Sequence, residues 1–240
     1  MFQLKLSIQL ENTRLPAEME RSMVSFLKAS IQKESQELYE KLFDSKKAVL
    51  KSYCFSCYLP QAAFEKNFIS LGAPEFTIFF SDADTEELLG FYNGFLKMKF
   101  VKYPLNGNSM CLTHVAVVPL KEIQEDHVII KMLSPLLVRD HDRENNRDRY
   151  CLFNEEDFSD VLKENTRYFL EQMGYGFSTE SFSIKPLKAK KVIVPAFGKL
   201  VDGNLGVYEL TGSPGLLNLL LAAGLGSRRS EGHGKFQVIL

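Results

Sequence analysis

The chain has 240 residues and a mass of 27.3 kDa, enough for one large domain or two small ones with real cores. Hydrophobic residues make up 45% and charged residues 25%, which excludes a disordered or collagen-like chain. The formal net charge is -1, so any nucleic-acid surface has to be a local cluster of positive charge.

The first half of the chain predicts the order strand, helix, two strands, helix, strand. Apolar residues alternate over residues 1–10, which predicts a strand, and recur at helical spacing over residues 16–43. Aromatic, β-rich runs predict strands at residues 53–59 and 75–80, and a helix is expected over residues 85–97. Strands at residues 100–103 and 113–118 complete a sheet. This is the order of a ferredoxin-like βαββαβ unit.

The second half repeats this order less clearly. We expect strands at residues 127–132, 182–187, 192–200 and 206–211, helices at 155–173 and 214–223, and a last strand at 235–240. The periodicities therefore predict an α+β protein. The expected division into two ferredoxin-like domains, residues 1–120 and 121–240, joined around residues 118–125, rests mainly on the resemblance given below.

A glycine-rich loop, GLGSRRSEGHG at residues 224–234, precedes the last strand. Its glycines, Gly224 and Gly226 among them, allow the backbone to approach a ligand closely. Ser227, Arg228, Arg229 and Ser230 suit a phosphate chain. Taken alone, the loop is equally compatible with a flexible connector.

Together with GSPGLLNLLLAAG before it, SPLLVRD at residues 134–140 and the runs LYEKLFD and KSYCFSCYL, the loop resembles the CRISPR-associated endoribonucleases. These form the repeat-processing branch of the RAMP superfamily. The resemblance implies a tandem ferredoxin-like fold, with RRM-like halves, that binds CRISPR repeat RNA and cuts it once without a metal ion. The ribose 2′-hydroxyl attacks the adjacent phosphate, leaving a 2′,3′-cyclic phosphate and a 5′-hydroxyl. Subunits of a CRISPR effector complex, and a second copy of this chain, are further partners that the resemblance leaves open.

The chain departs from the family at one important position. Many members carry a leucine-histidine-acidic motif that aligns with Leu42, Phe43 and Asp44, so Phe43 stands in place of the histidine. A tyrosine and a lysine of the family correspond to Lys28 and Lys51.

The resemblance therefore predicts that Lys28 and Lys51 stabilise the charge that develops on phosphorus. The expected accessory donors are Tyr39, Lys46 and Lys47. Two alternatives stay open: these lysines are simply solvated charges, or the protein binds repeat RNA without cutting it.

Three further features bear on RNA binding or cleavage. Lys188 and Lys190 share one face of an expected strand beside Lys191, which suits an RNA backbone or, alternatively, a solubilising edge strand. His233 stands where relatives commonly have an aromatic or aliphatic residue, so it is either a displaced acid or base or a packing residue. The charged run at residues 139–149 predicts a mobile loop whose arginines fold onto RNA.

The remaining motifs give less information about function. Cys54 and Cys57, with Cys111 and His114, have zinc-like spacing, but residues three apart on a strand point to opposite faces, so we expect no metal and no redox pair. His127 and His141 border expected loops, and no partner can be named for either. Without a signal peptide, or an apolar run near the roughly 20 residues of a membrane span, we expect a cytoplasmic protein that needs no cofactor.

Overall fold

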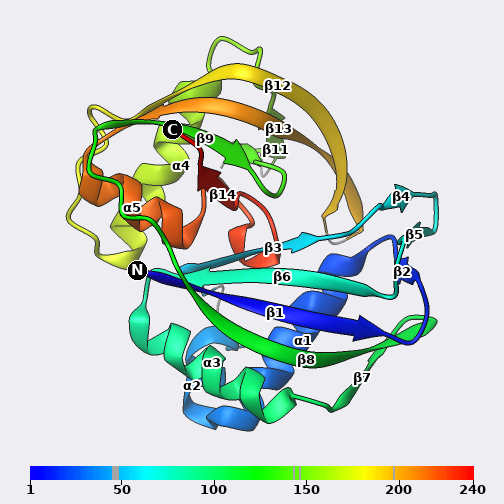
Figure 1. Cartoon of the computed structure of the whole chain (residues 1–240). Helices are drawn as coiled ribbons and strands as arrows, with labels where there is room; N and C mark the ends of the chain where they lie inside the picture. The colour runs from blue at the N-terminus through cyan, green and yellow to red at the C-terminus, as the bar shows by residue number, and fades with distance from the viewer. Residues whose placement is uncertain (45–48, 143, 146, 197) are drawn as a thin grey trace.

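The computed structural model describes residues 1–44, 49–142, 144–145, 147–196 and 198–240. Each half of the chain contains an antiparallel sheet with its own helices (Figure 1). None of the helices in these described ranges is both long enough and apolar enough to cross a membrane.

The first half contains a five-stranded sheet in the order β3-β6-β1-β8-β7. The strands are β1 (Phe2–Leu10), β3 (Tyr53–Tyr58), β6 (Glu75–Asp82), β7 (Lys102–Leu105) and β8 (Asn108–Pro119). Helices α1 (Met19–Glu34) and α3 (Thr85–Met98) cover one face, and α2 (Gln36–Phe43) follows α1 (Figure 1). The short strands β2 (Arg14–Pro16), β4 (Ala63–Phe64) and β5 (Phe68–Ser70) form a separate small sheet. Alternate residues of β1 are buried, which is why its sequence alternates.

The second half contains a four-stranded sheet in the order β12-β13-β9-β14. The strands are β9 (His127–Met132), β12 (Ser183–Ala196), β13 (Lys199–Thr211) and β14 (Phe236–Val238), and the helices are α4 (Phe158–Met173), α5 (Pro214–Ala223) and the short 3-10 helix η1 (Arg229–Glu231). In both sheets the order is second, third, first and fourth strand of a βαββαβ unit. The predicted tandem ferredoxin-like fold is therefore confirmed.

Each half has its own hydrophobic core. One buried cluster runs from Leu4 to Leu112 and the other from Ile123 to Phe236. A domain boundary between residues 120 and 121 stays a prediction, and it falls in the gap between these clusters.

The prediction of a single helix over residues 16–43 is wrong, because the helix is interrupted at Ser35. This residue is extended (φ -151°, ψ 119°), and its hydroxyl accepts a hydrogen bond from the Leu38 amide at 3.1 Å. A serine side chain competes with the helix for backbone groups and caps the next helix instead. The interruption separates α1 from α2, and α2 ends at Phe43.

The strand boundaries expected between residues 182 and 211 are also wrong. Residues 183–196 form one long strand, β12, which pairs along its length with β13. The pairing register shifts between Pro186 and Lys188, where proline cannot donate to the ladder. The expected break near residue 188 is thus a bulge, while the expected strand at 192–200 spans the turn into β13.

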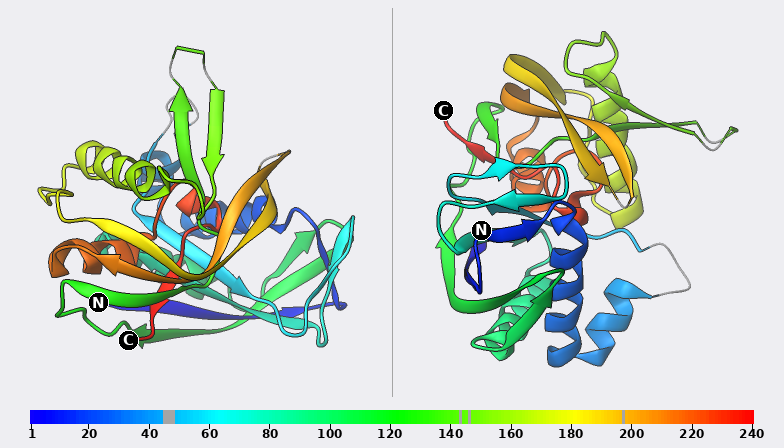
Figure 2. Two further views of the ribbon diagram at one scale, coloured as in Figure 1. Left: turned by 90° about the horizontal axis from the view of Figure 1, so that it is seen from above. Right: turned by 90° about the vertical axis from the view of Figure 1, so that its right-hand side faces the viewer.

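Residues 139–142 and 147–149 do not form the expected loop. They belong to a hairpin of β10 (Val138–Asp142) and β11 (Arg147–Cys151), which stands out from the rest of the molecule (Figure 2). Cross-strand ion pairs hold it together: Arg139 with Asp148 at 2.8 Å and Arg149 with Asp140 at 3.2 Å. Opposite charges facing each other across two strands replace the apolar contacts that the pattern lacks.

Candidate functional site

A large groove lies between the two halves of the chain, with a volume of 1780 Å³. Helices α1 and α2 and the segment leading into β3 supply one wall, and the β10–β11 hairpin with α4 supplies another. Residues 226–231 of the glycine-rich loop line it as well. The groove therefore combines residues from three distant parts of the sequence.

On the first wall, two lysines lie close to the ring of Phe43. The ammonium nitrogens of Lys28 and Lys51 lie 5.3 and 5.2 Å from the centre of its ring. Tyr39 packs against the same ring, with the ring centres 5.6 Å apart. Three of the predicted catalytic residues, Lys28, Tyr39 and Lys51, are thus brought together. Lys46 and Lys47 lie outside the described residues.

Lys51 differs from Lys28 in its surroundings. It is half-buried, and its ammonium donates a hydrogen bond to the Val49 carbonyl at 3.0 Å. Burial lowers the pKa of Lys51, and the positive charge of Lys28 lowers it further. Lys51 is therefore a better proton donor than an ordinary lysine, while exposed Lys28 contributes positive charge.

Three glycines of the loop lie so close to neighbouring protein atoms that a side chain would not fit. A Cβ on Gly226 would lie 2.4 Å from the Leu137 carbonyl oxygen, and one on Gly234 would lie 1.9 Å from the Leu225 carbonyl oxygen. Both have positive φ, 71° and 73°. A Cβ on Gly224 would lie 2.9 Å from the Cβ of Cys54 on β3. The sequence requires glycine here because the loop packs tightly between the two halves.

The polar residues of the loop are partly engaged. Both the amide and the hydroxyl of Ser227 donate to the Leu137 carbonyl, at 2.8 and 3.0 Å. Arg228 donates from Nε to the Tyr150 hydroxyl and from Nη1 to Glu231, each at 2.9 Å. Ser230 is half-buried in the groove lining. The loop is thereby attached to the hairpin.

Arg229 and His233 are buried. The Arg229 guanidinium carbon lies 3.6 Å from the centre of the Phe169 ring, and burial lowers the pKa of Arg229 to about 10. Burial, and then the charge of Arg228, lowers the pKa of His233 to about 4. The side chain of His233 is 2% exposed, which favours the packing interpretation over a displaced acid or base.

The basic segment lies elsewhere. Lys188 and Lys190 are exposed on β12, an edge strand, and Lys191 pairs with Asp202 at 2.8 Å. The residues described as lining the groove include none of these three. RNA that contacted both regions would have to extend beyond the groove.

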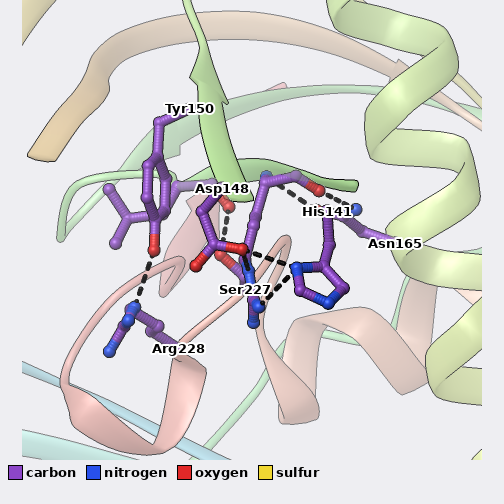
Figure 3. A network of polar contacts seen from close by, with 8 residues as sticks. His141, Asp148, Tyr150, Asn165, Ser227 and Arg228 are labelled. Atoms are coloured by element: carbon purple, nitrogen blue, oxygen red, sulfur yellow. Dashed lines mark hydrogen bonds and ion pairs between the residues drawn. The ribbon is translucent and has the colours of Figure 1, made fainter. Parts of the chain in front are cut away.

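The β10–β11 hairpin places a polar network on the groove wall that the sequence analysis missed (Figure 3). Asp148 Oδ1 lies 2.7 Å from His141 Nδ1 and accepts a hydrogen bond from Arg139 Nε at 2.8 Å. Arg139 Nη2 lies 3.1 Å from the same histidine nitrogen. The usable signal was the alternation of basic and acidic residues on both sides of the turn, which predicts facing charged pairs.

The two cysteine motifs lie on different strands. Cys54 and Cys57 are on β3, and Cys111 and His114 are on β8, with β6 and β1 between these strands in the sheet. Strands in a sheet are about 4.8 Å apart, so the two motifs do not meet. Cys54 is buried, and its sulfur contacts the Ala222 carbonyl at 3.4 Å.

Residues 118–238 match the family model of the C-terminal part of the CRISPR-associated protein Cas6. Among solved structures, the chain is similar to an RAMP protein that binds different RNA substrates, with a TM-score of 0.85, 17% identity and 100% of both chains covered. It is also similar to the product of a Cas6-related gene from Pyrococcus furiosus, with a TM-score of 0.85, 18% identity, and 99% and 98% of the two chains covered. A Cas6 product complex gives a TM-score of 0.72 at 14% identity, with 99% of each chain covered. The search of curated proteins finds no match.

Proposed function

Because this chain belongs to the Cas6 family of CRISPR-associated proteins, we propose that it cleaves CRISPR repeat RNA within precursor transcripts to produce guide RNAs. The observation that supports this most directly is the pair of lysine ammonium groups, Lys28 and Lys51, that both lie close to the Phe43 ring at the wall of the groove. Two positive charges at one place suit a phosphate that gains negative charge during the reaction.

In the proposed reaction, the ribose 2′-hydroxyl attacks the adjacent phosphorus, and the bond to the 5′ oxygen breaks. The products are a 2′,3′-cyclic phosphate and a 5′-hydroxyl. Lys28 and Lys51 stabilise the charge on the phosphoryl oxygens, and Tyr39, beside Phe43, is an accessory donor. The reaction needs no metal ion, so chelation leaves it unchanged.

The bound RNA runs over the glycine-rich loop, where Arg228 and Ser230 face the groove, and onto the exposed Lys188 and Lys190 of β12. Contacts with phosphates make affinity fall steeply with salt. Effector-complex subunits, or a second copy of the chain, remain predicted further partners.

The position of Phe43 favours one alternative: a protein that holds repeat RNA without cutting it. A phenylalanine in place of the family's histidine removes a group that can move a proton. Binding alone does not distinguish the two functions, whereas cleavage does.

The test is a single-turnover incubation, in EDTA, with end-labelled repeat RNA and a matched RNA that has a 2′-deoxy sugar at the cut site. We expect one discrete product with a cyclic phosphate end, and none from the deoxy substrate. Tight binding with no product would establish the non-cutting alternative.

Lys51→Ala tests the assignment of the lysines. We expect the single-turnover rate to fall about tenfold or more with little change in RNA affinity, because the charge acts mainly in the transition state. Lys33→Ala is the matched control, since Lys33 is an exposed lysine of α1 that does not line the groove. An unchanged rate for Lys51→Ala would remove Lys51 from the chemistry.

A further inference from the structure

One of the four histidines lines the groove, and it is His141. His233 is buried, His127 pairs with Glu209 at 3.3 Å on the second sheet, and His114 lies on β8. His141 is on the wall formed by the hairpin and α4, and Lys51 lines the same groove from the wall formed by α1 and α2. The imidazole missing at position 43 is therefore present in the groove, from the other half of the chain.

Asp148 orients the His141 ring. Partial burial raises the pKa of Asp148, but hydrogen bonds from His141 and Arg139 outweigh this and hold it below its usual value. The carboxylate is therefore charged, and its Oδ1 lies 2.7 Å from His141 Nδ1, while Arg139 Nη2, a donor, lies 3.1 Å from the same nitrogen. In the tautomer that we propose, the proton is on Nδ1 and Asp148 accepts it. This leaves Nε2 as the acceptor, the arrangement by which a carboxylate prepares a histidine to act as a base.

The base of the hairpin is held firmly. Asn165 of α4 bonds both backbone groups of Arg139, accepting from its amide at 3.0 Å and donating to its carbonyl at 2.7 Å. From the other side, Arg228 bonds Tyr150, and Ser227 bonds Leu137 (Figure 3). Contacts from α4 and from the glycine-rich loop therefore hold this strand in place, and the Asn165 contacts are to Arg139, two residues before His141. A catalytic group needs this kind of preorganisation.

The reaction itself requires groups on opposite sides of the phosphate. The attacking 2′ oxygen and the leaving 5′ oxygen lie roughly in line through phosphorus, so the base and the acid approach from opposite directions. Lys51 and His141 line the groove from two different walls.

We propose that His141 is the general base of RNA cleavage and that Asp148 is its positioning residue. This inference rests on the proposed function. Nε2 of His141 takes the proton of the 2′-hydroxyl as the 2′ oxygen bonds to phosphorus. The bond from phosphorus to the 5′ oxygen breaks, and that oxygen takes a proton from the Lys51 ammonium. Both side chains then return to their starting forms by exchange with water.

The first test is His141→Ala in the single-turnover assay. We expect the rate to fall about 100-fold, partial recovery with added imidazole, and unchanged RNA affinity, which also shows that the variant is folded. His127→Ala, outside the groove, is the matched control and keeps the full rate. Asp148→Asn lowers the rate without loss of affinity, and added imidazole does not restore it because His141 still occupies the position.

The second test distinguishes the general base from the general acid. It uses an RNA in which sulfur replaces the leaving 5′ oxygen, because a thiolate leaves without being protonated. This substrate restores part of the rate of Lys51→Ala, the part lost with the leaving-group proton, but leaves His141→Ala slow. Restoration of His141→Ala would overturn its role as the base. Equal cleavage by the unaltered protein and His141→Ala would overturn this inference alone, whereas no cleavage by the unaltered protein would overturn the proposed function and this inference with it.

Discussion

At the scale of single residues, Phe43 determines how the two lysines of the groove are held. The Lys28 and Lys51 ammonium groups both lie within 5.3 Å of its ring centre, and an aromatic face attracts cations. Phenylalanine therefore helps to keep two like charges in one place, although it cannot move a proton. An imidazole at the same position would have the Lys28 and Lys51 ammonium groups beside it.

We predict that Phe43→His increases the single-turnover cleavage rate about tenfold or more, because it adds a group that can accept or donate a proton. Phe43→Leu is the control: it removes the ring without adding an imidazole, and it leaves the rate at or below that of the unaltered protein. A rate for Phe43→His no higher than that of Phe43→Leu would contradict the prediction.

At the scale of elements, the glycine-rich loop is a packing element whose groove side carries the polar residues. The carbonyl oxygens of Leu137 and Leu225 occupy the space where side chains of Gly226 and Gly234 would lie. Tight packing of this kind fixes the positions of Arg228 and Ser230 at the groove.

Two alanine substitutions separate backbone conformation from packing. Gly234 and Gly174 have nearly the same φ, 73° and 72°, but a Cβ on Gly174 would meet no atom within 4 Å. Gly174→Ala is expected to cost about 1 to 2 kcal/mol for the left-handed conformation alone. Gly234→Ala is expected to cost about 2 kcal/mol more, because backbone atoms have to move. Urea unfolding measures both, and equal losses would show that the packing is unimportant.

At the scale of the whole molecule, a buried chain of hydrogen bonds joins the two halves. The Lys235 ammonium donates to the Ser81 hydroxyl at 2.7 Å, and that hydroxyl donates to the Ala222 carbonyl at 2.7 Å. Ser81 belongs to β6 of the first sheet, whereas Lys235 and Ala222 belong to the second half. Burial lowers the pKa of Lys235, since a charge in this position has little water around it.

We predict that Ser81→Ala destabilises the protein by about 1 to 3 kcal/mol, because it leaves a buried ammonium and a buried carbonyl without their partner. Lys235→Met removes the charge, so adding it to Ser81→Ala recovers part of that loss. A double-mutant cycle by urea unfolding should therefore give non-additive effects of about 1 kcal/mol. Strictly additive effects would mean that the two side chains do not depend on each other.

The sequence alone was enough to predict the tandem fold. Alternation in residues 1–10 and helical spacing in residues 214–223 follow from which face of each element is buried, and local pattern records that directly. The family resemblance, read from the sequence, also predicted the grouping of Lys28, Tyr39 and Lys51. Their catalytic roles stay predictions.

Only the tertiary structure showed which residues line the groove opposite Lys28, Tyr39 and Lys51. The charged residues 139–142 have no apolar period, so hydrophobic periodicity does not predict a strand there, and the structure shows one because they pair with β11. Arg228 and Arg229 are adjacent in sequence and both line the groove, yet Arg228 is only partly buried whereas Arg229 is buried against Phe169. His141 meets Asp148 because β10 pairs with β11, and it lines the groove because the two halves of the chain pack together. The spacing of neighbouring residues does not predict that long-range packing.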